Sequence, residues 1–458
     1  MKKINYIILS LIFTIVFSGC STSDLDPTIS QNKDAAEGIT NIDNLFAVLK
    51  GSLSRMTSSG YYGRDYIITN EVRTDNCFSN GNSGRFTTQA GFSYSATTGY
   101  IWDNCYAVIS SANLIINTDI TALEGDQDYG THLQGQAYFL RALAHFDLLK
   151  TYGQQHVGGT LGVPYITTYL SSTSTDEELF SSRNTVDEVK GMIMNDLQTA
   201  FTMMGGDDVV LPSKLAAKAL ESRVAIYFGM WNEAKLAAEE VIGEYSIMSS
   251  SNFVSSWESD HNNNSIFELA FNSTDNAGIN GLAYIYRTTG GGSYGDVQVI
   301  DEVEDLFEPG DVRGLGGILG FEGSMLRNIG KYPDNQGYDN VPVIRYEEVV
   351  LNYAEALFEL EGGSGDALTQ LNSITSNRGA SAYASPITKD DILTERRKEL
   401  MFEGFRYDDL LRTSSDIEKL YFQQNIAETI PYGDYRMAWA IPRAEMDANS
   451  NMVQNTGY

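Results

Sequence analysis

The sequence predicts a mostly α-helical protein, in which paired helices form a stacked scaffold that carries inserted, loop-rich regions. Three observations favour this fold class. Apolar residues recur with helical spacing over most of the chain between residues 34 and 412. A glycine followed five residues later by an alanine separates two predicted helices at two places. Two long stretches, about residues 57–99 and 245–344, replace the helical pattern with Gly, Ser, Thr, Asn and Tyr.

The chain opens with a segment that is typical of a secretion signal. Two lysines precede an apolar stretch from Ile4 to Phe17, and a Ser-Gly-Cys run ends it at Cys20. The stretch is shorter than the roughly 20 residues that a membrane-spanning helix needs, and polar residues follow at once. We therefore expect residues 1–19 to be removed. The run ending at Cys20 resembles a bacterial lipobox, which implies a lipidated Cys20 and a polar tether over residues 20–33.

One folded domain is expected from residue 34 to residue 458. A single strand is predicted at Ile266–Asn272. The segments with helical spacing are Asp34–Met56, Ile101–Ile116, Thr131–Tyr152, Thr185–Met204, Ser213–Gly229, Asn232–Glu244, Arg345–Glu361, Asp366–Ser376, Lys389–Gly404 and Tyr407–Arg412.

Two of the connections between helices have the same spacing. Gly229 precedes Ala234, and Gly362 precedes Ala367, each pair lying between two predicted helices. This spacing resembles the turn of a tetratricopeptide repeat, where a small alanine lets the paired helices approach closely. Each such pair leaves an apolar flank that only the next pair can cover, so the spacing indicates a stacked helical scaffold.

Composition excludes some partners. The formal net charge is −29, from 60 acidic and 31 basic residues, so nucleic acid and anionic membrane surfaces would be repelled. The 27 tyrosines suit polar, uncharged ligands or a wet protein interface, because tyrosine offers an apolar face and a hydrogen-bonding tip. With Cys20 lipidated, Cys77 and Cys105 remain, and an oxidising compartment allows one disulfide at most.

The sequence singles out no catalytic group. Glu395, Glu399 and Glu403 share one helical face, and we interpret them as part of a structural lattice of charges. The candidate cations are Lys398 and Arg406, which lie three residues from Glu395 and Glu403, and cations of neighbouring helices such as Arg141. No nucleophile elbow is present, and the four histidines have no metal-ligand spacing. His145 is expected to be a packed, hydrogen-bonded side chain. We predict that the protein is not an enzyme and has no cofactor, and the sequence names no metal-ligand residues, which leaves open whether a structural metal ion is bound.

The two irregular stretches supply the candidate ligand-binding residues. Both mix aromatic side chains with amides and arginines, which is the combination that holds sugars or peptides, whereas Trp102 is expected in the core because it opens an amphipathic helix. The candidates are Arg73, Asp75, Asn76, Asn80, Arg85 and Phe86 in the first stretch, and Trp257, Tyr284, Tyr286, Arg287 and Tyr294 in the second.

An ordered series of motifs resembles the SusD/RagB family of nutrient-binding outer-membrane lipoproteins. The motifs are RALAHFDLLKTYG at 141–153, RYEEVVLNYAEALFE at 345–359, ERRKELMFEGFRYDDLLR at 395–412, WAIPRAEM at 439–446 and QNTGY at 454–458. Thr375 stands where the family often has arginine, and Thr456 replaces a common proline. The resemblance implies a tetratricopeptide-type scaffold whose loops bind a ligand, and a SusC-like TonB-dependent transporter as partner.

These observations predict a lipid-anchored protein on the outer-membrane surface that captures a glycan or oligosaccharide and delivers it to the transporter. A peptide-capturing member of the same family is one alternative. A helical-repeat scaffold whose only partner is protein is a second, and a surface glycosidase is a third. The ligand itself is not identified by the residues.

Overall fold

The computed structural model describes residues 38–97, 100–171, 173–206, 208–288 and 293–458. The predicted signal, Cys20 and the tether over residues 20–33 lie outside these residues, as do residues 34–37 of the first predicted helix. All elements below belong to the unit formed by residues 41–458. Within the described residues, no helix is both long enough and apolar enough to cross a membrane.

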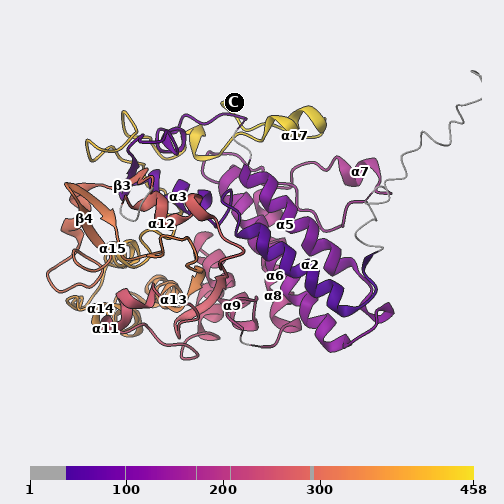
Figure 1. Ribbon diagram of the computed structural model, residues 1–458, viewed down its shortest axis with the longest axis horizontal. Helices are drawn as coiled ribbons and strands as arrows, with labels where there is room; N and C mark the ends of the chain where they lie inside the picture. Colours follow the sequence, from indigo (N-terminus) through magenta and orange to yellow (C-terminus); the bar gives the residue numbers. More distant parts are fainter. Residues whose placement is uncertain (1–37, 98–99, 172, 207, 289–292) are drawn as a thin grey trace, which may run out of the picture. The chain divides into compact units, whose positions relative to one another are not determined.

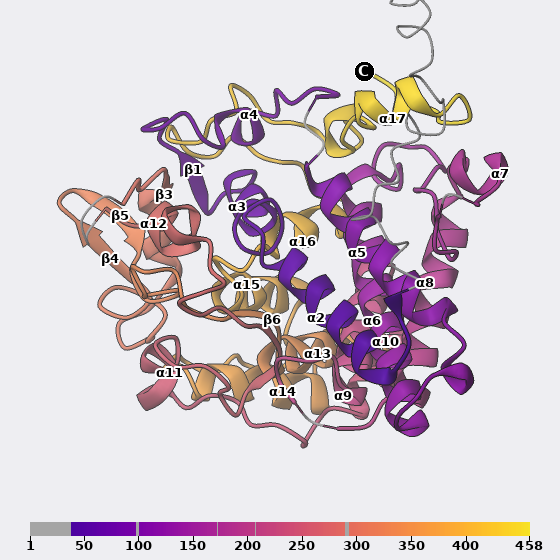
Figure 2. The same ribbon diagram turned by 45° about the vertical axis from the view of Figure 1, so that its right-hand side comes forward.

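The long helices pack against one another in chain order. Helix α2 contacts α5, which contacts α6, and the series continues through α8, α9, α10, α13 and α14 (Figures 1 and 2). The helices are α2 Ile42–Met56, α3 Asp65–Val72, α4 Thr87–Ala90, α5 Tyr100–Asn117, α6 Gln127–Tyr152, α7 Asp176–Leu179, α8 Val186–Met203, α9 Lys214–Tyr227, α10 Trp231–Glu239, α11 Ser250–Ser256, α12 Leu282–Tyr286, α13 Tyr346–Glu361, α14 Asp366–Ser376, α15 Lys389–Glu399, α16 Arg406–Arg412 and α17 Arg443–Ala448. This series confirms the predicted stacked helical scaffold.

Side-chain caps set where several helices begin. The Asn41 side chain accepts a hydrogen bond from the backbone of Asn44, so the first predicted helix starts at Ile42. At the start of α8, the Thr185 side chain accepts from the backbone of Glu188 and the Glu188 side chain accepts from the backbone of Thr185, which is a capping box. These caps satisfy backbone N–H groups that have no partner within the helix.

The two glycine–alanine connections lie in neighbouring helix pairs. Gly229 has φ +67° between α9 and α10, and Gly362 has φ +92° between α13 and α14, which are backbone conformations that favour glycine. Ala234 and Ala356 are fully buried where α10 meets α13. Although about 100 residues separate the two pairs in sequence, they are therefore adjacent in the stack.

The first irregular stretch contains more regular structure than the sequence predicted. Residues 57–97 include α3 and α4 as well as a short strand, where the composition indicated loops only. The helix predicted over Lys389–Gly404 is also shorter, because it ends at Glu399. The Lys331 ammonium donates to the carbonyl oxygens of Glu399 and Met401, at 2.8 and 2.9 Å, and so takes the place of helical partners.

The strands form three two-stranded antiparallel sheets: β1 Cys77–Ser79 with β3 Val297–Val299, β2 Ser265–Leu269 with β6 Val341–Arg345, and β4 Leu319–Glu322 with β5 Met325–Asn328. The strand predicted at Ile266–Asn272 is present as β2. Its partner β6 leads directly into α13, so this sheet joins the second irregular stretch to the helical scaffold.

Candidate functional site

Pairing of β1 with β3 brings the two irregular stretches together. Cys77 lies opposite Val299 and Ser79 lies opposite Val297 in an antiparallel register. The ladder continues for one more residue, because the Asn80 N–H donates to the carbonyl oxygen of Asp296 at 3.0 Å. The segments near residues 80 and 295 therefore lie side by side, next to α3 and α12 (Figures 1 and 2).

Arg85 and Tyr294 meet across this junction. The guanidinium carbon of Arg85 lies 4.1 Å from the centre of the Tyr294 ring, within the range of a cation–π contact. The same guanidinium is 3.4 Å from the carboxylate of the buried Asp296 and 3.0 Å from the hydroxyl of Ser83. The Arg85 side chain keeps 29% of its surface exposed. Its planar group is thus held in place while part of it still faces solvent.

Amide side chains surround this contact. Asn80 donates to the carbonyl oxygen of Gly295 at 2.7 Å, and Asn82 donates to that of Tyr294 at 2.6 Å. The Asn280 side-chain oxygen accepts from Arg64 at 3.0 Å and from Arg85 at 3.4 Å. Tyr284 is half-buried, and its carbonyl oxygen accepts from the backbone of Tyr294. We call Asn80, Asn82, Arg85, Asn280, Tyr284 and Tyr294 the loop surface.

Three candidates from the first stretch are buried instead. Arg73 stacks on Tyr407, with its guanidinium carbon 3.6 Å from the ring centre, and bonds to the backbone of its own helix. Asp75 pairs with Arg397 and Arg406, at 2.9 Å each. Asn76 is fully buried and accepts from Arg397 at 2.7 Å. These side chains fix the loop to the scaffold.

The remaining candidates are also buried. Phe86 packs under Arg64, and Trp257 lies against Lys331 and Arg345. Tyr286 packs edge-on against Phe402, and Arg287 donates to the carbonyl oxygen of Tyr332 at 2.8 Å. Of the residues predicted from sequence, the loop surface therefore keeps Asn80, Arg85, Tyr284 and Tyr294.

Sequence reasoning did not select Asn82 or Asn280. Both lie in the predicted irregular stretches, so composition places them in the right regions but does not distinguish them from other asparagines there. Their position follows from the register of β1 with β3 and from the one-turn helix Gly278–Asn280, neither of which has a distinctive sequence pattern.

The carboxylates considered for catalysis are held in buried ion pairs. Glu395 pairs with Arg313 at 2.6 Å, and Glu403 pairs with Lys331 at 2.6 Å. Glu399 pairs with Arg313, Arg345 and Arg378. The structural lattice is present, but its cations come from other segments than expected.

Arg141 does not take part in that lattice, since it pairs with Asp196 at 2.7 Å. His145, on the same helix, is packed as predicted. Its Nδ1 bonds to the carbonyl oxygen of Arg141 and its Nε2 accepts from the backbone of Ile166. Burial lowers the pKa of this histidine to about 3, so it is neutral near neutral pH.

Cys77 and Cys105 are both buried and both free, so the structure contains no disulfide between them. Among the described residues, no group of His, Cys, Asp and Glu side chains is arranged to hold a metal ion.

The fold is a stacked helical-repeat scaffold, and its inserted loops carry a polar, aromatic surface. Residues 24–226 match the family described as "Starch-binding associating with outer membrane", and residues 327–458 match the SusD family. The chain belongs to the SusD/RagB family.

Relatives support the same assignment. SusD-like protein P2 of Formosa agariphila is 24% identical over the whole of both chains. The starch-binding protein SusD of Bacteroides thetaiotaomicron is 27% identical over 28% of this chain and 22% of its own. A solved structure of a putative sugar binding protein from Bacteroides vulgatus has a TM-score of 0.83 and 28% identity, covering 92% of this chain and 99% of the other.

Proposed function

We propose that the protein binds a glycan or oligosaccharide at the loop surface and passes it to a TonB-dependent transporter of the outer membrane. The observation that carries this proposal is the partly exposed Tyr294 side chain, held against Arg85 and surrounded by amide side chains. Sugars bind through their C–H faces to aromatic rings and through their hydroxyls to amides and guanidinium groups. The loop surface offers both kinds of contact.

Preorganisation supports binding at this surface. Asp296 is fully buried and bonds to both the backbone and the hydroxyl of Ser83, at 2.9 and 2.8 Å, while it also faces Arg85. The loop carrying Arg85 is thereby fixed to the segment before β3, which carries Tyr294, before any ligand arrives. A ligand then meets a surface with little side-chain entropy left to lose, which favours affinity.

Delivery and anchoring rest on the sequence and the family. The lipobox-like run ending at Cys20 would attach the protein to a membrane through several acyl chains, which is strong enough to be stable. The family description places its members with the outer membrane, and two relatives carry names that state starch or sugar binding. Capture at the cell surface with transfer to a SusC-like partner accounts for these features together.

The alternatives differ in what the loop surface holds. A peptide could use the same aromatic and amide groups, so peptide capture remains the main rival. A protein-only scaffold would leave the loop surface without a small ligand. A glycosidase would need two carboxylates flanking the ligand, and the Asp296 carboxylate that contacts Arg85 is buried and bonded to Ser83.

The test is a binding screen of the chain from Ser21 onward against glycan and peptide arrays, with product analysis in the same wells. We expect saturable binding of at least one glycan and no product. Binding of peptides alone would favour peptide capture, product formation would favour the enzyme, and no binding of either class would favour the scaffold.

Variants locate the site. Tyr294→Ala and Arg85→Ala should each weaken glycan binding about tenfold, since each removes one of the two side chains that form the cation–π contact. Tyr353→Ala on α13 and Arg55→Ala on α2 are matched controls, because these partly exposed side chains lie on the helical scaffold. Equal losses in controls and test variants would contradict the assignment of the loop surface.

A further inference from the structure

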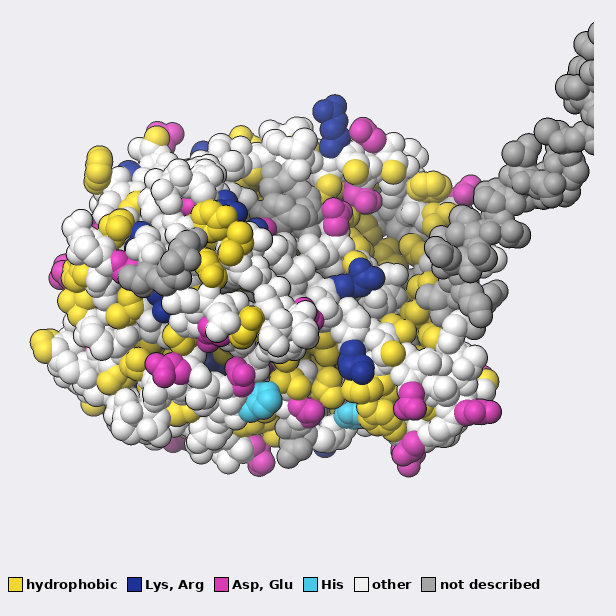
Figure 3. Space-filling model, in the orientation of Figure 1, with side chains coloured by type: hydrophobic (Ala, Val, Ile, Leu, Met, Phe, Trp, Pro, Cys, Tyr) yellow, Lys and Arg dark blue, Asp and Glu magenta, His cyan; other side chains and the backbone are white. Residues whose placement is uncertain are grey.

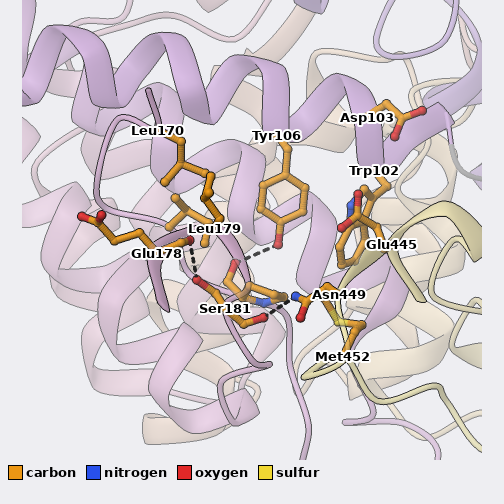
Figure 4. Close-up of a pocket in the computed structure, with 12 residues that line it drawn as sticks. Trp102, Asp103, Tyr106, Leu170, Glu178, Leu179, Ser181, Glu445, Asn449 and Met452 are labelled. Atoms are coloured by element: carbon orange, nitrogen blue, oxygen red, sulfur yellow. Dashed lines mark hydrogen bonds between the residues drawn. The ribbon is translucent and has the colours of Figure 1, made fainter. Parts of the chain in front are cut away.

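A second opening lies between α5, α7 and α17, away from the loop surface. It has a volume of about 360 Å³ (Figure 4). The α5 side chains Trp102 and Tyr106 form one wall, and Leu170, Leu179 and Met452 contribute apolar surface from two other segments. Trp102 belongs to the core, as predicted, with 3% of its surface exposed, but its edge faces this opening. We call the opening the α5–α17 pocket.

Most side-chain donors in the α5–α17 pocket are already used inside the protein. The Tyr106 hydroxyl donates to the carbonyl oxygen of Pro164 at 2.8 Å, and the Ser181 hydroxyl donates to that of Glu178 at 3.1 Å. The Asn449 amide donates to the carbonyl oxygen of Ser181 at 2.8 Å. These bonds are drawn in Figure 4. The pocket therefore offers an incoming group apolar surface and acceptors.

The charge of the pocket is of one sign. Asp103, Glu178 and Glu445 line it, and none of its lining residues is basic. Arg183 lies behind the wall, but its guanidinium donates to carbonyl oxygens of the protein, including those of Gly162 and Val453. Burial raises the pKa of Glu445, with a smaller contribution from the charge of Asp103, although the Trp102 side chain donates a hydrogen bond to this carboxyl group. The Glu178 carboxylate accepts from the backbone and hydroxyl of Thr175 as the cap of α7 and points away from the other two (Figure 4). Among the described residues Asp103 and Glu445 have no ion pair with a cation, so a positive group beside them would relieve their repulsion.

Exposed apolar side chains extend the pocket onto the surface. Leu179, Phe180 and Val453 are 45%, 37% and 54% exposed. Asn451 donates to the carbonyl oxygen of Phe180 at 2.7 Å, so the segment after α7 and the C-terminal segment are held side by side. Figure 3 shows hydrophobic side chains gathered in a hollow on this side of the molecule. Apolar surface grouped in this way marks an interaction site more often than scattered residues do.

We propose that the α5–α17 pocket docks a polypeptide segment of a partner protein that presents an apolar side chain next to lysine or arginine. The apolar side chain would fill the pocket beside Trp102, and the cation would lie near Asp103 and Glu445. Charge complementarity selects this occupant, since an acidic segment would add a third negative charge beside Asp103 and Glu445. This inference does not depend on the proposed glycan, because the loop surface is formed by other segments.

The test uses protein labelled with 5-fluorotryptophan, in which the Trp102 resonance is assigned from the Trp102→Phe variant. The probe is the peptide acetyl-Leu-Lys-Leu-Lys-amide, compared with acetyl-Leu-Glu-Leu-Glu-amide and with acetyl-Gly-Lys-Gly-Lys-amide. We expect the first peptide to shift the Trp102 resonance saturably. The other two should bind at least tenfold more weakly, since the second lacks the cation and the third lacks the apolar side chain.

Variants connect the shift to the pocket. The double variant Asp103→Asn with Glu445→Gln should weaken the cationic peptide about fivefold, and Leu179→Ser should weaken it comparably. Asp447→Asn, an exposed carboxylate on α17 outside the pocket lining, is the matched control and should bind normally. Melting temperatures confirm that each variant is folded.

Several outcomes would overturn the proposal. They are no saturable shift with the cationic peptide, an equal shift with the acidic peptide, or a shift of Trp102 by maltoheptaose in place of the peptide. The last result would make the pocket a sugar site. Glycan binding at the loop surface is measured separately with the Arg85→Ala variant, so the two proposals are tested independently.

Discussion

The Arg378 guanidinium donates two hydrogen bonds, each 2.8 Å long, to the two carboxylate oxygens of Glu399, and both side chains are fully buried. Arg345 and Arg313 also contact the same carboxylate, at 3.1 and 3.2 Å. Burial alone would raise the pKa of Glu399, but these three guanidinium groups outweigh it and hold the pKa well below its usual value. The end of α15 is thereby tied to β6 and to the segment after α14.

Glu399→Gln should destabilise the protein strongly. The substitution removes one buried charge and leaves three arginines without their shared partner, and breaking a buried pair in this way costs about 3–5 kcal/mol. The free energy of unfolding in urea measures the loss. Glu361→Gln, which affects a pair with Lys235 on the surface, is the control and should leave the urea midpoint almost unchanged.

The same change predicts a pH dependence. A carboxyl group whose folded pKa is depressed stabilises the protein above its unfolded pKa of about 4.5, and this stabilisation is lost as the pH falls through the folded value. The difference in stability between the natural chain and Glu399→Gln should therefore shrink in acid. A difference that stays constant from pH 7 to pH 3 would contradict the role given to the charge.

Glu71 should show the opposite behaviour. Burial raises the pKa of this carboxyl group to about 7, although the Gly404 N–H donates to it at 2.8 Å. Because the folded pKa lies above the unfolded one, Glu71 contributes a stabilisation that is fully present below about pH 4.5. That stabilisation is lost as the pH rises through about 7. We expect Glu71→Gln to have a higher melting temperature than the natural chain at pH 8, and a similar one at pH 4.5.

Thermal melts across this range measure the effect. Glu233→Gln on α10 is the control, because that residue is exposed and should leave the pH profile unchanged. A Glu71→Gln variant that melts lower than the natural chain at every pH would show that Glu71 acts through hydrogen bonding and not through its ionisation.

Much of the scaffold could be predicted because helix periodicity and turn glycines are local signals. The bounds of Asp366–Ser376 agree with α14, and Ile101–Ile116 differs from α5 by one residue at each end. Short elements were missed where their stability comes from distant partners. Helix α3, for example, has all of its residues buried, so its sequence does not alternate between an apolar face and a polar face.

The candidate site could be predicted only by region. Composition located both loop stretches, but it did not separate exposed from buried side chains within them. Asp75 illustrates the reason, because its partners Arg397 and Arg406 lie more than 300 residues away in the sequence. Arg85 and Asp75 look equivalent in a loop, and only the tertiary contacts show that Asp75 is neutralised in the interior while Arg85 reaches the surface.

Cys77 and Cys105 should resist modification in the folded protein. Burial, followed by the nearby Glu71 and Asp147 charges respectively, raises the pKa of each thiol well above its usual value. We expect maleimide at pH 7.5 to label neither cysteine in the chain from Ser21 onward, and to label both in guanidinium chloride. The number of labels is measured by mass spectrometry without a reducing agent. A protein that takes up no label in denaturant, and whose mass is about two units below that of the chain with two free thiols, would contain a disulfide.

Close packing of α10 on α13 is the basis of the last prediction. Ala234 and Ala356 are fully buried at this contact. Because protein interiors are close-packed, a longer side chain at either position would displace its neighbours. Ala234→Leu should therefore destabilise the protein by about 1–3 kcal/mol through overpacking, measured by urea unfolding. Leu236→Ala is the control on the same helix, since Leu236 is 64% exposed and its truncation should change the urea midpoint little. If Ala234→Leu leaves the midpoint unchanged, the two helix pairs do not depend on this close approach, and other contacts must hold them in register.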